Sequence, residues 1–277
     1  MESFFTFLER RVSDSSSLLC IGLDPHIGDL PSPTAAAALR FCIDLVERTA
    51  PCAAAFKPNA AFFEQFGAPG WDALKRVIDG IRERSRHLGS MIPVILDAKR
   101  GDIASTAEAY ARSAFQELGA HAVTLSPYLG RDSVEPFLAD GEKGAFLLCK
   151  TSNPGAHDLQ DLPVGVAGEP LYVTVARLGR SWNTRNNLGL VVGATQPEAM
   201  ARVRQAAPEL WFLAPGIGAQ GGELEPALRA GLRRDGRGLL LPVSRAIARA
   251  ADPGQAAAAL RDEIVSIQYR LAGSGRA

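Results

Sequence analysis

The sequence has 277 residues, and its 30 basic and 30 acidic side chains give a formal net charge of zero. Hydrophobic residues make up 47% and charged residues 22%, which is typical of a globular protein and excludes a disordered or collagen-like chain. The balanced charge argues against general nucleic-acid binding, which needs a basic surplus to neutralise phosphates. It does not exclude a local pocket for one phosphorylated small molecule.

The N-terminal segment predicts a short amphipathic helix packed on the domain. Phe4, Phe5, Leu8 and Val12 recur at helical spacing within residues 1–12. Charged side chains interrupt this stretch, so it lacks the apolar core of a signal peptide. No segment of the chain reaches the ~18 uninterrupted apolar residues that a membrane span needs. We therefore expect no membrane association and a cytoplasmic protein.

The cysteines and histidines predict neither disulfides nor a metal site. No cysteine belongs to a Cys-x-x-Cys pair, and most lie in or beside apolar stretches, so we interpret them as reduced and structural. The histidines are scattered without metal-ligand spacing, and His26 and His157 are interpreted as surface or turn residues. The four cysteines are Cys20, Cys42, Cys52 and Cys149.

Short apolar runs alternate with longer amphipathic stretches along the whole chain. Most of the runs are continuously apolar, as expected for parallel strands that are covered on both faces. The runs cover residues 18–23, 53–56, 92–96, 122–125, 145–149, 188–193, 211–214 and 238–243. The clearest helical stretches cover residues 34–48, 103–118 and 171–182.

This alternation predicts an α/β fold, a closed (β/α)8 TIM barrel that forms a single domain over residues 1–277. The competing open, doubly wound sheet usually has a Gly-x-Gly-x-x-Gly turn after its first strand, whereas the first run here leads into Asp24 without that turn. The Pro/Gly-rich stretch 153–170 is predicted to be either a functional loop or a poorly ordered one. The tail from Gly273 is expected to fray.

Polar residues that follow the apolar runs are the candidate site residues, because barrel active sites form at the carboxyl ends of the strands. Asp97 and Lys99 are two residues apart, so both are expected to point the same way from a strand end. Asp102 follows at a helix start, where its charge suits the helix dipole. With Lys57 on the neighbouring strand, two lysines and two aspartates would alternate in one mouth, which indicates catalysis. The alternative is a capping aspartate beside an ordinary surface ion pair.

A phosphate site is predicted after the last two runs. Residues 215–222 are rich in glycine and expose backbone N–H groups, and Arg245 follows the eighth run, which matches the usual phosphate site of such barrels. Gln220 lies inside the glycine-rich stretch and could donate to a phosphate. Asp24 could accept hydrogen bonds from a sugar hydroxyl, and Ser152 could read a heterocycle edge. A plain turn role is the alternative for each of these residues, and Phe62 is interpreted as packing.

The combination of these motifs resembles the orotidine 5′-phosphate decarboxylase family. Asp97-x-Lys99-x-x-Asp102-Ile103, Lys57, residues 215–222 and Ser244-Arg245 follow the family's order. The segments Phe56-Lys57-Pro58 and Thr151-Ser152-Asn153-Pro154-Gly155 resemble its longer-chain subgroup. Related barrel decarboxylases share the Asp-x-Lys-x-x-Asp piece alone, so the combination is the more specific signal. One departure is Ser244, where many members of the family have glycine.

The resemblance implies decarboxylation of orotidine 5′-phosphate to uridine 5′-phosphate, the last step of de novo UMP synthesis, without a metal or organic cofactor. It makes Lys99 the proton donor to C6 of the pyrimidine and places Asp97 near the departing carboxylate. Other roles implied by the resemblance are ribose binding by Lys57 and Asp24, pyrimidine contact by Ser152, a base-to-phosphate bridge by Gln220, phosphate binding by Arg245, and substrate contacts by Pro215 and Ser244.

The resemblance also implies a homodimer with shared active sites. In the family, Asp102, Ile103 and Thr106 enter the site of the other subunit. Thr106 lies four residues after Asp102, on the same helical face, which fits that arrangement.

The chemistry suits the residues independently. Loss of CO₂ from an sp² carbon leaves a localised carbanion, which a fixed ammonium stabilises and then protonates. Flanking aspartates keep Lys99 charged. Two alternatives stay open: a decarboxylase of a sugar-phosphate keto acid that uses a divalent metal, and a non-catalytic nucleotide-binding dimer.

Overall fold

The computed structural model describes residues 2–166, 168–217 and 223–274. Its main sheet has eight strands in the order β2-β1-β10-β9-β8-β5-β4-β3, and every pairing is parallel. Parallel bridges from Phe56 to Val94 and from Asn59 to Asp97 join β2 to β3 and close the barrel. The strands are β1 (Leu19–Leu23), β2 (Ala55–Pro58), β3 (Ile95–Arg100), β4 (Ala122–Leu125), β5 (Gly144–Lys150), β8 (Leu188–Val192), β9 (Phe212–Leu213) and β10 (Leu239–Val243).

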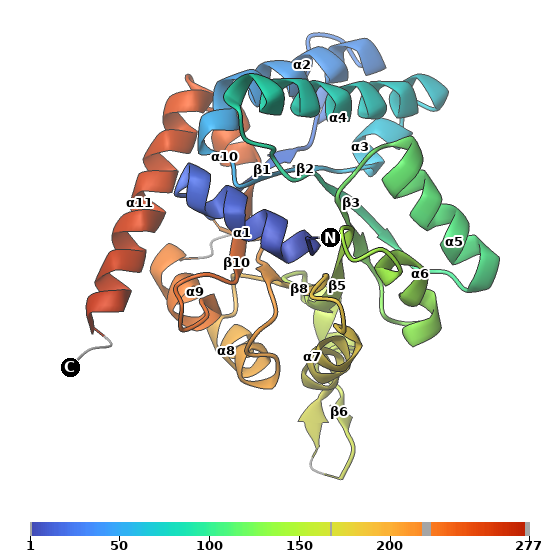
Figure 1. The fold of residues 1–277 in the computed structure, drawn as a ribbon, viewed down its shortest axis with the longest axis vertical. Helices are drawn as coiled ribbons and strands as arrows, with labels where there is room; N and C mark the ends of the chain where they lie inside the picture. Colours follow the sequence, from blue (N-terminus) through green and yellow to red (C-terminus); the bar gives the residue numbers. More distant parts are fainter. Residues whose placement is uncertain (1, 167, 218–222, 275–277) are drawn as a thin grey trace.

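Helices surround this barrel, as Figure 1 shows. The helices are α1 (Phe4–Ser15), α2 (Ala35–Thr49), α3 (Ala61–Glu64), α4 (Ala68–Leu88), α5 (Ala104–Arg112), α6 (Glu135–Leu138), α7 (Leu171–Trp182), α8 (Pro197–Ala206), α9 (Leu224–Gly231), α10 (Arg245–Ala248) and α11 (Pro253–Ser274). Each predicted strand and each of the three predicted helical stretches coincides with an observed element. The predicted (β/α)8 barrel is therefore confirmed.

Two sequence features explain where these helices begin and end. Thr34 begins α2, and its hydroxyl accepts a hydrogen bond from the backbone N–H of Ala37, which satisfies one free donor of the first turn. The stretch predicted as one helix from 103 to 118 is α5 followed by a π-helical turn over Ser113–Glu117. Gly89 ends a different helix, α4, with a φ of 66°, in the left-handed region that glycine adopts without strain.

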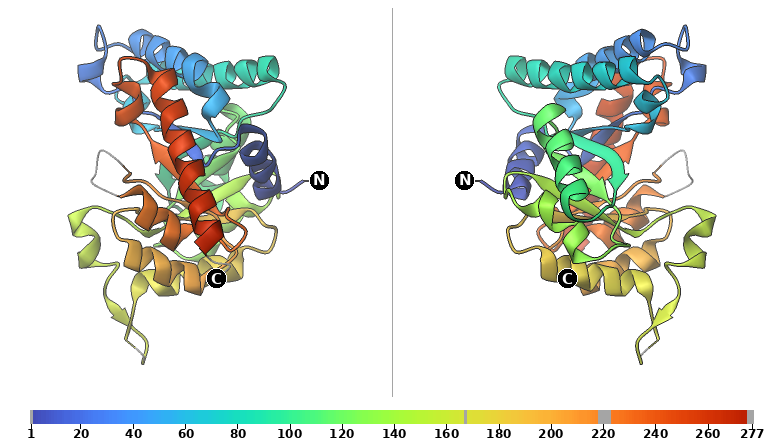
Figure 2. Two further views of the ribbon diagram at one scale, coloured as in Figure 1. Left: turned by 90° about the vertical axis from the view of Figure 1, so that its left-hand side faces the viewer. Right: turned by 90° about the vertical axis from the view of Figure 1, so that its right-hand side faces the viewer.

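Helix α1 closes the end of the barrel opposite the carboxyl ends of the strands, as predicted for a helix packed on the domain (Figures 1 and 2). The Phe5 ring stacks on Trp211 with a centroid distance of 6.1 Å and meets Phe146 edge to face at 5.6 Å. A Cβ on Gly144 would lie 2.2 Å from the Phe4 ring, so only glycine leaves room for this close packing. Helix α1 therefore covers the barrel at the amino ends of these strands.

The segment between β5 and α7 contains regular secondary structure of its own. It contains a 3₁₀ helix, η5 (Pro154–Asp158), and an antiparallel pair of short strands, β6 (Pro163–Val164) and β7 (Glu169–Pro170). This hairpin projects from the body of the molecule in Figures 1 and 2. The single domain and the frayed tail stay predictions, since α11 is described to Ser274 and the last three residues lie outside the described part.

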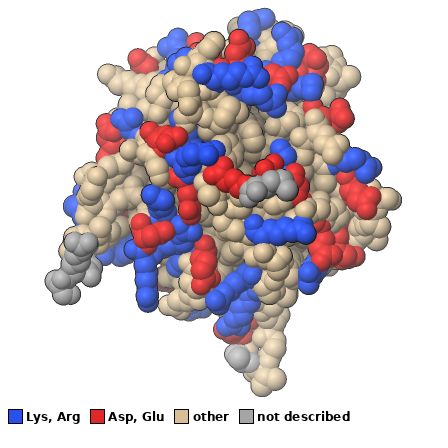
Figure 3. All heavy atoms as spheres, in the orientation of Figure 1, with Lys and Arg blue, Asp and Glu red and all other residues tan. Residues whose placement is uncertain are grey.

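The distribution of surface charges and the state of the cysteines agree with what the sequence predicts. Basic and acidic side chains are interspersed on the face shown in Figure 3, with no large region of one sign. All four cysteines are buried and free of disulfides, as predicted. Within the described ranges, no helix is both long and apolar enough to cross a membrane.

Candidate active site

Three of the predicted charged residues meet at the carboxyl ends of β2 and β3. The Asp97 carboxylate accepts hydrogen bonds from two lysines. Lys57 Nζ lies 2.8 Å from Asp97 Oδ2, and Lys99 Nζ lies 2.5 Å from Asp97 Oδ1. The structure therefore joins Lys57, Asp97 and Lys99 into one array, which we call the charge array.

Burial and mutual attraction fix the charges of this array. The side chains of Lys57 and Asp97 are 9% and 12% exposed, while Lys99 is 51% exposed. Burial by itself lowers the pKa of Lys57, but the carboxylates of Asp97 and Asp24 outweigh it and raise that pKa. Burial raises the pKa of Asp97, but Lys57 and Lys99 outweigh it and hold that pKa well below its usual range. The carboxylate and the buried ammonium are both charged at neutral pH.

A buried threonine that the sequence reading assigned only to a strand supports the array. The Thr124 hydroxyl, on β4, donates to Asp97 Oδ1 at 3.1 Å. It also accepts from the backbone N–H groups of Ala98 at 3.0 Å and Lys99 at 2.9 Å. These contacts lie where the β3–β4 register shifts and where Lys99 has a φ of 45°, a conformation that non-glycine residues rarely adopt. Thr124 thus holds both Asp97 and the irregular backbone that carries Lys99.

A cavity of about 410 Å³ opens beside the charge array at the carboxyl ends of the strands. This is the end of the barrel at which the sequence analysis predicted a site. The predicted site residues that line it are Asp24, Lys57, Asp97, Pro215, Ser244 and Arg245.

Two groups in the cavity are available to bind a ligand. Asp24 Oδ1 is buried, yet it has no hydrogen-bond partner among the described residues. A buried acceptor without a partner is costly, so this atom fits a ligand that donates a hydrogen bond. Arg245 begins α10 at the cavity wall, and no described carboxylate lies within ion-pair distance of it. The cavity therefore offers an acceptor and a cation to one ligand.

Sequence reasoning missed part of the cavity wall. Asn59 also lines the cavity, as do His26 and Phe62, whose rings meet edge to face with centroids 4.4 Å apart. His26 does lie in a turn, but the turn folds back so that its backbone N–H donates to the carbonyl of Asp24 at 2.8 Å. The interpretations of His26 as a plain turn residue and of Phe62 as packing are therefore incomplete. The direction of a turn depends on contacts that a sequence pattern does not show.

Other predicted residues stand apart from the cavity within one chain. The Asp102 carboxylate accepts from the backbone N–H of Ile103 at 2.8 Å and joins neither lysine of the array. Ile103 is 51% exposed and Thr106 is also exposed, at the start of α5. Ser152 follows β5 and does not line the cavity. Gln220 lies outside the described residues.

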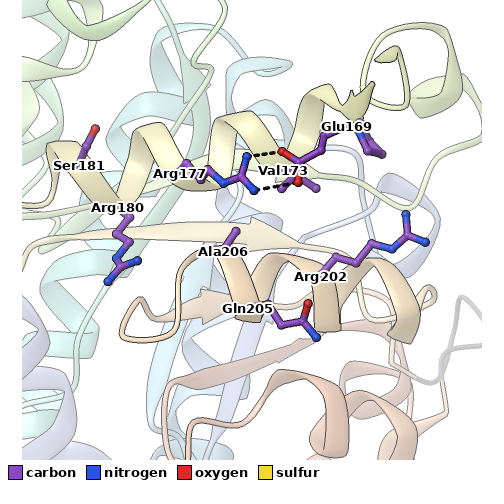
Figure 4. Close-up of a pocket in the computed structure, with 9 residues that line it drawn as sticks. Glu169, Val173, Arg177, Arg180, Ser181, Arg202, Gln205 and Ala206 are labelled. Atoms are coloured by element: carbon purple, nitrogen blue, oxygen red, sulfur yellow. Dashed lines mark hydrogen bonds and ion pairs between the residues drawn. The ribbon is translucent and has the colours of Figure 1, made fainter. Parts of the chain in front are cut away.

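A second cavity, of about 810 Å³, lies on the outer side of the barrel between α7 and α8 (Figure 4). It is lined by three arginines, but two of them are already paired. Arg177 Nη2 donates to Glu169 at 2.8 Å, and Arg180 lies 3.4 Å from Glu209. This cavity is therefore less suited to an anion than the barrel mouth. Across the described ranges, no group of three or more His, Cys, Asp or Glu side chains is placed to hold a metal ion.

The fold and the site define a class of molecule: a TIM-barrel enzyme with a lysine–aspartate array beside a cavity that can receive an anionic, hydroxyl-bearing ligand. Comparison with known proteins specifies the family. Residues 17–260 match the model of the orotidine 5′-phosphate decarboxylase / HUMPS family, and the chain belongs to this family.

Relatives with known names match nearly the whole chain. An orotidine 5′-phosphate decarboxylase of Roseiflexus castenholzii is 49% identical over 94% of this chain and 93% of its own length. The structure of Leishmania donovani OMP decarboxylase covers 96% of this chain and 99% of its own, with 54% identity and a TM-score of 0.86. Leishmania donovani UMP synthase has 55% identity and a TM-score of 0.89. The match covers 97% of this chain but 57% of the synthase.

Proposed function

We propose that this chain decarboxylates orotidine 5′-phosphate to uridine 5′-phosphate, the last step of UMP synthesis, as a carbon–carbon lyase. Its family and its near-full-length similarity to named orotidine 5′-phosphate decarboxylases support this activity. The structural observation that carries the proposal is the charge array, in which Asp97 binds Lys57 and Lys99 beside the cavity. We propose that this array acts without a metal or organic cofactor.

In the proposed mechanism, Lys99 stabilises the transition state and donates the proton. The bond from C6 of the pyrimidine to the carboxylate breaks, CO₂ leaves, and the electron pair stays on C6. The Lys99 ammonium stabilises this developing charge and gives C6 one of its protons, and water then returns a proton to the neutral amine. Asp97 lies near the departing carboxylate and keeps Lys99 oriented and charged.

The remaining candidate residues are proposed to bind the substrate. Asp24, with its unpartnered oxygen, and Lys57 take the ribose hydroxyls. Arg245 binds the phosphate by charge-assisted hydrogen bonds, with Ser244 and Pro215 beside it at the cavity wall. Further proposed contacts are those of Ser152 with the pyrimidine edge and of Gln220 with base and phosphate.

The site is proposed to be completed by a second copy of the chain. Asp102, Ile103 and Thr106 do not line the cavity of their own chain and remain accessible at the start of α5. They are available to enter the site of a partner, which would make the protein a homodimer with two shared active sites. We place this enzyme in the cytoplasm, with a nucleotide substrate and neither a nucleic acid nor a membrane as partner.

A spectrophotometric assay with orotidine 5′-phosphate, with and without a chelator, tests the proposed function. Undiminished turnover in the chelator, with one CO₂ released per uridine 5′-phosphate formed, is the expected result. Loss of turnover in the chelator and its return with a divalent ion would favour the metal-dependent alternative. Tight binding of uridine 5′-phosphate without CO₂ release would instead identify a non-catalytic nucleotide-binding protein.

A further inference from the structure

The segment that follows β5 is held in place by two side-chain pairs, each of which joins a residue just before Ser152 to a residue eight or nine positions after it. We infer that Lys150, Thr151, Gln160 and Asp161, here called the clamp, position Ser152 for recognition of the pyrimidine. The inference rests on the proposed function, in which Ser152 contacts the base. The clamp residues themselves are positioning residues, because none of them lines the cavity.

The first pair is an ion pair between a buried lysine and a partly exposed aspartate. Lys150 is the last residue of β5 and is 2% exposed, and its Nζ donates to Asp161 Oδ1 at 2.7 Å. The same ammonium lies 5.4 Å from the centre of the Tyr172 ring, and His157 Nδ1 contacts the second Asp161 oxygen. A buried ammonium is very costly without its counterion, so Asp161 is fixed to the end of β5. Residues between them must loop back over the strand end.

The second pair fixes the residue immediately before Ser152. Gln160 Oε1 accepts from the backbone N–H of Thr151 at 2.8 Å, and Gln160 Nε2 donates to the Thr151 hydroxyl at 2.7 Å. The Thr151 hydroxyl in turn donates to Asn153 Oδ1 at 2.7 Å. Both the main chain and the side chain of Thr151 are therefore held by one amide, and the residue after Ser152 is tied to the residue before it.

The far end of the segment is anchored as well. The backbone N–H of Tyr172 donates to the carbonyl of Gln160 at 3.0 Å, and Cys149 Sγ donates to the carbonyl of Tyr172 at 3.1 Å. The start of α7 thus supports the clamp from outside the barrel. Gln160 and Asp161 are adjacent in sequence, so this support holds both of them against the end of β5.

Ser152 is confined from the barrel side by the end of β8. A Cβ added to Gly193 would lie 3.2 Å from both the Cβ and the backbone nitrogen of Ser152. The N–H of Gly193 also donates to the carbonyl of Lys150 at 2.8 Å. The absence of a side chain at Gly193 therefore lets Ser152 lie directly against the residue that follows β8, while the clamp holds the two residues that precede Ser152.

This arrangement predicts a selective effect on the base. Weakening the clamp gives Ser152 a wider range of positions and reduces the contribution of its contact with the pyrimidine. The phosphate and ribose ends of the cavity are built from Asp24, Lys57 and Arg245, on other strands. A ligand without a base should therefore bind as it does to the wild-type enzyme.

Calorimetric titration of the full-length enzyme with uridine 5′-phosphate and with ribose 5-phosphate tests the inference. Gln160→Ala and Asp161→Asn should each weaken uridine 5′-phosphate about three- to tenfold, the size of one lost hydrogen bond. Binding of ribose 5-phosphate should stay within about twofold, which also reports that the site is folded. Asp161→Glu keeps the charge and should recover part of the loss. Asp158→Asn removes one negative charge from an exposed position on the same segment and should change neither ligand.

Ser152→Ala separates failure of this inference from failure of the proposed function. If Ser152→Ala weakens uridine 5′-phosphate selectively and both clamp variants leave it unchanged, the clamp has no positioning role. If the clamp variants weaken both ligands equally, their effect is a general loss of structure, and the inference is overturned. If Ser152→Ala itself leaves the ratio of the two affinities unchanged, Ser152 does not read the base, and the clamp loses its proposed purpose with it.

Discussion

Two ammonium groups share one carboxylate at the barrel mouth, and their exposures differ. Asp97 lies between Lys57 and Lys99, so the repulsion between the lysines is offset by two short ion pairs of 2.8 and 2.5 Å. Lys57 is buried and has little room to move, whereas the Lys99 side chain is half exposed. Of the two lysines, Lys99 is the one whose ammonium is open to water and can exchange a proton with it, which suits it to the proposed role of proton donor.

Removal of that ammonium should separate catalysis from binding. In Lys99→Ala, turnover of orotidine 5′-phosphate is expected to fall by about 10³-fold or more, because both charge stabilisation and proton donation are lost. The affinity for uridine 5′-phosphate should change only modestly, since the charge on C6 exists only in the transition state. Steady-state kinetics and calorimetry on the same preparation measure both quantities. Near wild-type turnover would show that another group donates the proton.

Thr124 offers a test of how far the array depends on its support. Thr124→Val keeps the shape of the side chain but removes the hydroxyl, leaving Asp97 with one donor fewer and two backbone N–H groups without their acceptor. We expect turnover to fall about tenfold and the free energy of unfolding to fall by about 1–3 kcal/mol. Thr124→Ser should restore most of the turnover. An unchanged kcat in the valine variant would mean that Lys99 keeps its position without Thr124.

Substitution of Arg245 should lower the affinity for phosphorylated ligands alone. Arg245→Ala is expected to weaken uridine 5′-phosphate by about ten- to a hundredfold, as for loss of a charge-assisted hydrogen bond pair. Uridine, which has no phosphate, should lose little. Equal losses for nucleotide and nucleoside, measured by titration, would point instead to a folding defect around α10.

At the scale of elements, a half-buried histidine joins the residues that lead into β3 and β4 and predicts that the fold is sensitive to acid. His121 Nδ1 accepts from the backbone N–H of Val94 at 3.1 Å, so the ring must be neutral at that nitrogen. Burial, helped by the nearby positive charges of Lys143 and Arg82, lowers the pKa of His121 to about 4. The unfolded chain has an ordinary histidine pKa near 6.5 and therefore takes up a proton first as the pH falls.

This difference predicts a loss of stability between pH 7 and pH 5. Because the unfolded state binds more protons in this range, the free energy of unfolding should fall by on the order of 1–2 kcal/mol from this group. His121→Asn keeps an acceptor near the position of Nδ1 but does not titrate. Urea unfolding at both pH values should show a smaller acid loss for this variant than for the wild type. Identical losses would assign the acid sensitivity to other groups.

The strands were predictable because parallel strands covered on both faces are mostly apolar throughout, as in residues 145–149 and 188–193. Helix α7 was predicted to the residue because its apolar positions follow one stripe from Leu171 to Trp182. The charged residues at the carboxyl ends of β2 and β3 were predicted because they directly follow apolar runs. Thr124 could not be found in this way, since its role depends on an irregular register between β3 and β4 that no local pattern encodes.

At the scale of the whole molecule, one chain has an incomplete set of the expected site residues. The Asp102 carboxylate binds the backbone of Ile103 and stays away from both lysines of its own chain. An alternating set of two lysines and two aspartates therefore requires Asp102 from elsewhere. The proposed two-fold symmetric dimer would supply it to both sites at once, since each chain would give what it receives.

Mixing two inactive variants tests this central claim most directly. Lys99→Ala and Asp102→Ala homodimers should both be nearly inactive. In a mixed dimer, both lesions fall in one site, and the other site combines an intact Lys99 with an intact Asp102. Random reassociation of equal amounts makes about half of the dimers mixed, each with one working site, so activity should return to roughly a quarter of the wild-type value. Absence of recovery under conditions that demonstrably exchange subunits would contradict the account, because each site would then be built from one chain.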